Sequence, residues 1–133
     1  MAGLNDFIAR LERFSREQVM DTIGRKIADT CHAQCIAGFR EQRDPYGKQW
    51  APRKDKRGTW PLLDKTGAGI DSLTSRYVNG MVTMRIRGYF RFHQSGTAVM
   101  ESRKVFPESA SGLGSWEDPI NRAATDAVRE LMR

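Results

Sequence analysis

The sequence has little of what marks a secreted, disulfide-stabilised or membrane-bound protein. Its 133 residues include two cysteines and two histidines. No run of about 18 apolar residues, the length that a membrane helix needs, occurs in it. Residues 1–16 lack the basic-then-apolar pattern of an export signal. We therefore expect one domain, residues 1–133, in a reducing cytosol and without membrane contact.

Signatures of catalysis are equally scarce. The chain contains no Gly-x-Ser-x-Gly nucleophile motif and no Gly-x4-Gly-Lys phosphate loop. His93 is a candidate general base, but no nucleophile motif and no evident pair of carboxylates accompanies it. We accordingly predict that the protein is not an enzyme, has no catalytic or cofactor-binding residues, and requires no cofactor.

Cys31, His32 and Cys35 form a cluster that invites interpretation as a metal site. On a helix, the two cysteines share a face, whereas His32 points about 100° away, so one ion would not readily take all three ligands. A fourth ligand would have to be His93. Because free cysteine is among the most buried residue types, we predict two buried thiols and no metal.

The net charge of +6 is distributed unevenly. Residues 40–57 hold seven basic and three acidic residues, and residues 85–104 hold five basic and one acidic residue. Each segment is therefore +4, and the rest of the chain is −2 (6 − 4 − 4). Such segments suit an anionic partner, either nucleic acid or an acidic protein face. The candidate contacts are Arg53, Lys54, Lys56, Arg57, Arg103 and Lys104.

Apolar residues repeat at helical spacing through the first forty residues. Leu4, Phe7, Ile8 and Leu11 predict a short helix that ends near Phe14, and Ser15 with Gln18 forms a capping-box pattern after it. An i, i+4 stripe then runs through Val19, Ile23, Ile27, Cys31, Cys35 and Phe39. It predicts a helix of roughly 24 residues and about 36 Å. Few domains of this size could cover such a rod alone, so one end should project or pack on a neighbour.

The second half of the chain carries strand and turn signals. Asn79-Gly80 favours a β-hairpin, with Val82, Met84 and Ile86 facing the core and Thr83, Arg85 and Arg87 facing water. A final helix is predicted from about Asp118 to Leu131. The predicted fold is therefore α+β, with a long N-terminal helix and a C-terminal helix packed on a small antiparallel β-sheet around residues 77–87. Mobile loops are expected near residues 51–61 and 96–115.

Three short motifs follow one another along the chain. They are residues 44–52 (Asp-Pro-Tyr-Gly-Lys-Gln-Trp-Ala-Pro), residues 63–67 with 71–73, and residues 89–96 (Tyr-Phe-Arg-Phe-His-Gln-Ser-Gly). In this order they resemble the DPdGxxWxP, LxxTGxLxxSL and YAxIHQFG elements of the phage virion morphogenesis family, the tail completion proteins of Mu-like contractile-tailed phages. Gly69 and Ser95 depart from the leucine and phenylalanine usual there. The motif residues are Asp44, Pro45, Gly47, Trp50, Thr66, Gly67, His93, Gln94 and Gly96.

The resemblance implies a structural protein of a phage or prophage that acts in tail completion or head–tail joining, generally as an oligomeric ring. Its partners would be other tail or head–tail proteins. It would act in the cytoplasm of a bacterial host during assembly and would remain in the virion. The motifs would then set a turn at 44–47, a bend at 66–67 and a helix end at 93–96. The alternative is a small basic DNA-binding protein of a mobile element, with aromatic residues of the basic segments stacking on bases.

Overall fold

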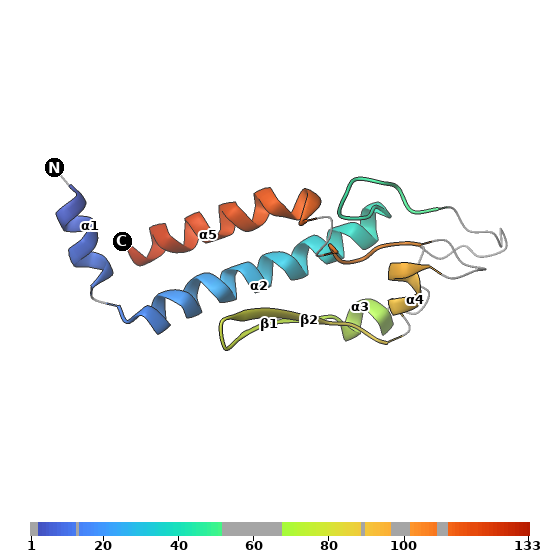
Figure 1. Ribbon diagram of the computed structural model, residues 1–133, viewed down its shortest axis with the longest axis horizontal. Coiled ribbons are helices and arrows are strands. Elements are labelled where there is room, and N and C mark those ends of the chain that lie inside the picture. Colours follow the sequence, from blue (N-terminus) through green and yellow to red (C-terminus); the bar gives the residue numbers. More distant parts are fainter. Residues whose placement is uncertain (1–2, 13, 52–67, 89, 97–101, 109–111) are drawn as a thin grey trace.

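The computed structural model describes residues 3–12, 14–51, 68–88, 90–96, 102–108 and 112–133. The fold is α+β, as predicted, with a long helix, a C-terminal helix and a two-stranded antiparallel sheet. The long helix forms the middle layer, between the C-terminal helix on one side and the hairpin on the other (Figure 1). Among the described residues, none of the helices combines the length and the apolar character needed to cross a membrane.

The two N-terminal helices are α1 (Leu4–Leu11) and α2 (Arg16–Glu41). The predicted capping box is confirmed, since Gln18 N donates to Ser15 Oγ at 3.1 Å and Ser15 N donates to Gln18 Oε1 at 2.9 Å. α2 has 26 residues, close to the predicted length. It ends at Gln42, which adopts a left-handed conformation with φ of 55°. The predicted end of the first helix, near Phe14, lies slightly beyond the observed one at Leu11.

The apolar stripe of α2 is buried unevenly. Cys31, Cys35 and Phe39 in its C-terminal half are buried, whereas the stripe residues of its N-terminal half are only partly buried. In that half the closest approach is at Gly24, where a Cβ atom would collide with the ring of Tyr77 in the hairpin. The absence of a side chain at Gly24 therefore allows the hairpin to lie against the helix.

The hairpin consists of β1 (Thr74–Val78) and β2 (Met81–Arg85), preceded by the short helix α3 (Ala68–Ser72). Asn79 and Gly80 connect the strands with φ of 51° and 81°, as an Asn-Gly hairpin turn requires. The predicted alternation is confirmed, because Val82, Met84 and Ile86 are partly buried while Thr83, Arg85 and Arg87 are exposed. Ser75 Oγ donates to the Ala28 carbonyl at 2.6 Å, which ties the hairpin to α2.

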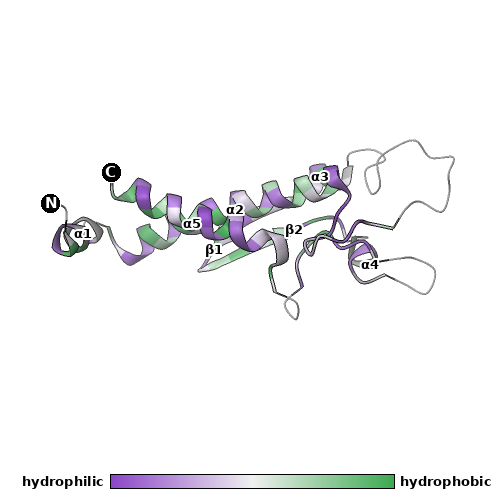
Figure 2. Cartoon of the chain, turned by 90° about the horizontal axis from the view of Figure 1, so that it is seen from above, coloured by the Kyte–Doolittle hydropathy of each residue, from purple (hydrophilic) through white to green (hydrophobic). Residues whose placement is uncertain are grey.

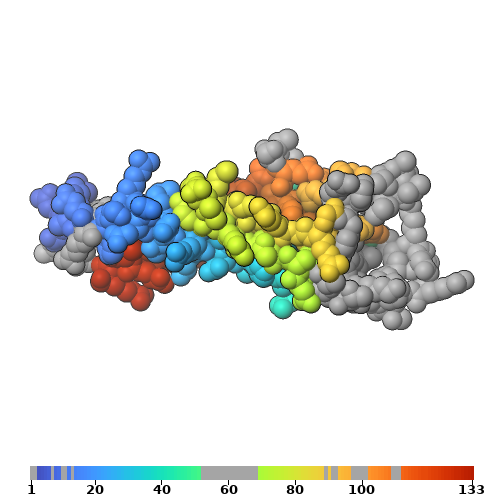
Figure 3. Space-filling model, turned by 90° about the horizontal axis from the view of Figure 1, so that it is seen from below, coloured from blue at the N-terminus to red at the C-terminus, as the bar shows by residue number. Residues whose placement is uncertain are grey.

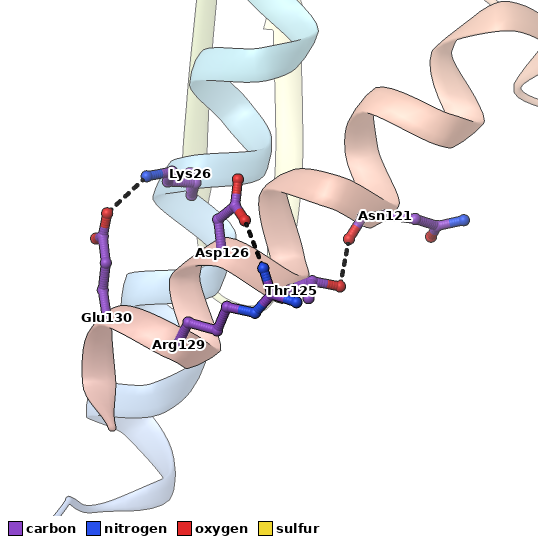
Figure 4. A network of polar contacts seen from close by, with 6 residues as sticks. All are labelled: Lys26, Asn121, Thr125, Asp126, Arg129 and Glu130. Atoms are coloured by element: carbon purple, nitrogen blue, oxygen red, sulfur yellow. Dashed lines mark hydrogen bonds and ion pairs between the residues drawn. The ribbon is translucent and has the colours of Figure 1, made fainter. Parts of the chain in front are cut away.

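The C-terminal helix α5 (Glu117–Leu131) confirms the predicted one, and the 3-10 helix η2 (Gly114–Trp116) leads into it. Ala123 and Ala127 are buried, and their small side chains allow α5 to approach α2 closely. Lys26 and Glu130 form an ion pair at 3.0 Å between the two helices (Figure 4). Because both side chains are about half exposed, this pair adds at most about 1 kcal/mol to stability.

The hydrophobic core gathers around the C-terminal half of α2. The Phe39 ring lies edge-on to Trp50, with centroids 5.6 Å apart, and to Phe90 in α4 (Phe90–Ser95), with centroids 5.7 Å apart. The core cluster comprises Cys31, Cys35, Phe39, Trp50, Leu73, Phe90, Val105 and Trp116. Segments from most of the chain thus meet at one end of the long helix. Figure 2 shows apolar and polar residues interleaved along the helices.

The two loops expected to be mobile lie largely outside the described residues. Of the first loop only Ala51 is described. In the second, residues 102–108 and 112–113 are described and contain neither helix nor strand, and η2 follows them. The mobility of both loops remains a prediction.

Candidate functional site

The first motif folds into a turn immediately after α2. Asp44 Oδ1 accepts hydrogen bonds from the backbone N–H groups of Tyr46 at 2.9 Å and Lys48 at 2.8 Å. Asp44 N donates in return to the Lys48 carbonyl at 2.8 Å. Gly47 has φ of 85°, a conformation that glycine adopts without steric cost, and Pro45 cannot continue the helix. The carboxylate of Asp44 therefore organises the backbone of this turn.

Trp50 anchors the end of the same motif in the core. It is 4% exposed, and its indole Nε1 donates to the Lys104 carbonyl at 3.0 Å. Its backbone N–H donates to the Gln42 carbonyl at 2.7 Å. A buried indole with its one donor satisfied is a stabilising arrangement. Trp50 thus joins the end of α2 to the 102–108 segment.

Gln94, in the third motif, holds the 102–108 segment through its side chain. Its Oε1 accepts from Val105 N at 2.9 Å and Phe106 N at 3.1 Å, and its Nε2 donates to the Phe106 carbonyl at 2.7 Å. α4 ends at the next residue, Ser95, and Gly96 follows with φ of 75°, the usual conformation of a glycine after a helix. The amide of Gln94 therefore supplies three hydrogen bonds to the backbone of this segment, in addition to the bond from Arg103 N to the His93 carbonyl.

Tyr46 and Gly114 connect the first motif to the start of α5, and the sequence reasoning did not single them out. Tyr46 Oη accepts from Glu108 N at 2.8 Å and donates to the Gly112 carbonyl at 2.7 Å. Gly114, with φ of 59°, lies so close to the Pro45 carbonyl that a Cβ atom would collide with it. The hydrogen-bond partners of the Tyr46 hydroxyl lie more than sixty residues away, so no local pattern in the sequence could reveal this contact. The only signal that Tyr46 matters was its position inside a motif.

A hollow of about 300 Å³ lies beside the Asp44 turn. Its lining is mixed, with Glu41, Arg43 and Asp44 on one part and Val105 and Trp116 on another. The Asp44 carboxylate already accepts two backbone hydrogen bonds. The hollow therefore belongs to the packing of the motif segments against α2.

The described residues of the first and third motifs thus lie together at the C-terminal end of α2. A family model described as the phage virion morphogenesis family matches residues 3–124. The chain belongs to this family. No curated protein and no solved structure matches it significantly. Of the motif residues in this virion morphogenesis protein, Thr66 and Gly67 lie outside the described part of the chain.

The two thiols of this family member are buried and free, as predicted. Burial raises the pKa of Cys31, and burial together with the nearby Cys31 raises the pKa of Cys35 to about 12. Both thiols therefore stay protonated and unreactive at neutral pH. Over the described ranges, no three His, Cys, Asp or Glu residues are grouped so that they could hold a metal ion. The metal content of the protein remains a prediction.

His93 lies half-buried on α4, with its ring 5.7 Å from that of Phe90. Burial, with a smaller contribution from the Arg103 guanidinium, lowers the pKa of His93. Its carbonyl accepts from Arg103 N at 2.6 Å. The imidazole is therefore held neutral at physiological pH, within the same unit that Gln94 holds together.

The six basic candidates are only partly described. Arg53, Lys54, Lys56 and Arg57 lie outside the described residues. Arg103 Nε donates to the Ala51 carbonyl at 3.0 Å, and the Lys104 carbonyl accepts from Trp50. The structure therefore brings Arg103 and Lys104 next to residues 50–51, which belong to the other basic segment. Contact of these residues with an anionic partner remains a prediction.

Proposed function

We propose that this protein is a structural component of phage or prophage tail assembly, acting in tail completion or head–tail joining. It works as an oligomeric ring whose partners are other tail or head–tail proteins. The observation that carries the proposal is membership of the virion morphogenesis family over residues 3–124. The protein acts in the cytoplasm of the bacterial host and stays in the virion.

The hydrogen bonds that the motif side chains make support a structural role for these residues and not a catalytic one. The side chains of Asp44, Trp50 and Gln94 all bond to backbone groups of neighbouring segments. A catalytic side chain would instead need to present its polar atoms to a substrate. The motif therefore builds the fold, and other surfaces of the molecule remain for assembly.

Deletion of the gene from an inducible prophage tests this proposal. We expect lysates in which heads and tails accumulate without joining or with unfinished tails, as seen by electron microscopy. Wild-type protein supplied from a plasmid should restore infectious particles, and a tagged copy should cosediment with the tails. Normal infectious virions after deletion would contradict the proposal. Sequence-selective binding of the purified protein to duplex DNA, without incorporation into particles, would favour the DNA-binding alternative.

A further inference from the structure

Among the described residues, large apolar side chains are exposed mainly at the end of the rod opposite the motifs. Of the exposed large apolar residues, Leu4, Ile8, Met20, Val78 and Met81 all belong to α1, the first turns of α2 or the tip of the hairpin. Leu4 and Ile8 are 73% and 42% exposed, and Val78 and Met81 are 52% and 63% exposed. α1 lies beyond the N-terminal end of α2, and the hairpin tip is separated from it in each view (Figures 1 and 3).

A helix like α1 needs a surface to pack on. It has 8 residues, and isolated helices shorter than about 12 residues are barely stable in water. Within the described residues, α1 makes no extensive contact with another helix or strand. Leu4 and Ile8 are one turn apart and share a face. That face is therefore the part of α1 that a packing partner would cover.

We propose that α1 is an arm that binds the outer face of the hairpin on a neighbouring copy of this chain. The inference rests on the proposed ring, and it names the two surfaces that would join its subunits. Each chain carries both surfaces at separate places, so the contact runs from one copy to the next. A contact between two different surfaces generates a ring when the rotation closes.

The two surfaces match in both polarity and charge. Directly after α1, Glu12 follows Ile8 by one turn on the same side, because Glu12 N continues the helical pattern and donates to the Ile8 carbonyl at 2.9 Å. On the outer face of the hairpin, the paired Val78 and Met81 lie at the tip, and exposed Arg76 and Arg85 follow them. Residues 73–88 contain no acidic residue. Apolar contact at Ile8 thus places Glu12 beside the arginines.

The spacings of the two surfaces also agree. Four residues of α-helix separate Ile8 from Glu12, which is about 6 Å along α1. Two residues of β-strand separate Val78 from Arg76, which is about 7 Å along β1. If Ile8 lies over Val78, Glu12 therefore reaches Arg76. So small an interface is weak for a single pair, and a ring in which every copy makes two such contacts offsets that weakness.

A charge exchange tests the pairing. We expect E12R and R76E each to weaken self-association about fivefold, because each variant places like charges together. A fivefold change in the association constant corresponds to roughly 1 kcal/mol. The double variant E12R/R76E should restore the wild-type association measured by sedimentation at high protein concentration. D6R is the matched control, since Asp6 lies on the opposite side of α1, and it should leave association unchanged. Failure of the double variant to recover would overturn the pairing.

Disulfide trapping tests the same contact without relying on charge. The variant I8C/V78C should form reducible oligomers on oxidation, whereas D6C/V78C and the wild type, whose own cysteines are buried, should not. A bridge within one chain, or equal trapping by D6C/V78C, would overturn the proposal. The arm and the tail role can also be separated in a strain in which deletion of the gene blocks tail completion. If α1 variants still complete tails there and I8C/V78C forms no oligomers, the proposed tail role stands and the contact made by α1 is excluded.

Discussion

The two ends of α2 differ in how completely the chain covers them. At the C-terminal end, three buried stripe residues meet Trp50, Phe90, Val105 and Trp116, and side chains of the motifs bond to backbone groups. At the N-terminal end, α1 and the hairpin tip leave large apolar side chains exposed. The same helix therefore supports a finished core at one end and an open surface at the other.

This difference separates the motif residues from those available for contact. The described motif residues all lie at the covered end, where they set turns, end helices and bind the 102–108 segment. In this protein the described motif residues therefore serve the fold. The open end carries few of the residues that revealed the family, and it is where we place the contacts of assembly.

The largest expected effect is that of truncating Trp50. Trp50→Ala should lower the free energy of unfolding by about 3–5 kcal/mol, because it leaves a cavity at a site that is 4% exposed. Met81→Ala at the open end should change stability by less than about 0.5 kcal/mol. Urea unfolding followed by circular dichroism measures both. Equal losses would remove the distinction between the two ends.

Gln94→Ala comes next. It leaves two N–H groups and one carbonyl of residues 105–106 without their partner, and we expect a loss of about 2–3 kcal/mol. Gln49→Ala is the matched control, since Gln49 is exposed in the neighbouring turn. The same urea titration applies. A loss for Gln94→Ala no greater than that of the control would show that residues 102–108 are held by other contacts.

Alanine substitutions at Gly114 and Gly47 separate the cost of a positive φ from the cost of a steric clash. Both have positive φ, but only at Gly114 would a Cβ atom meet the Pro45 carbonyl. Gly47→Ala should cost about 1 kcal/mol, and Gly114→Ala should cost about 1 kcal/mol more. Thermal unfolding of the two variants side by side gives the difference. Identical melting temperatures would mean that the turn does not press against the start of α5.

The smallest effect is a pH dependence from His93. Its pKa is lowered in the folded state, so the unfolded chain binds the proton more readily and stability falls as pH drops through about 6.5. His93→Gln should reduce this slope between pH 7.5 and roughly 5.5. His32→Gln should retain it. If His32→Gln flattens the slope and His93→Gln does not, the assignment of the titrating group is wrong.

Some features of the fold followed from sequence because they depend on neighbours along the chain. Ser15 and Gln18 cap a helix through residues three apart, and Asn79-Gly80 sets a turn by its own backbone preferences. Alternation along β2 is likewise local, so this strand was found with its faces, and the final helix was found close to its observed bounds. The family resemblance rested on motifs that are also local.

Only the tertiary structure decided which parts of these elements meet. The stripe of α2 runs unbroken from Val19 to Phe39, yet it is fully buried only in its C-terminal half, where the core cluster packs against it. The hydrogen-bond partners of the Tyr46 and Trp50 side chains lie more than fifty residues away along the chain. Periodicity states which face of a helix is apolar, but burial depends on what packs there. That is why the sequence determined a long amphipathic helix, while folding determined that one of its ends is covered and the other is open.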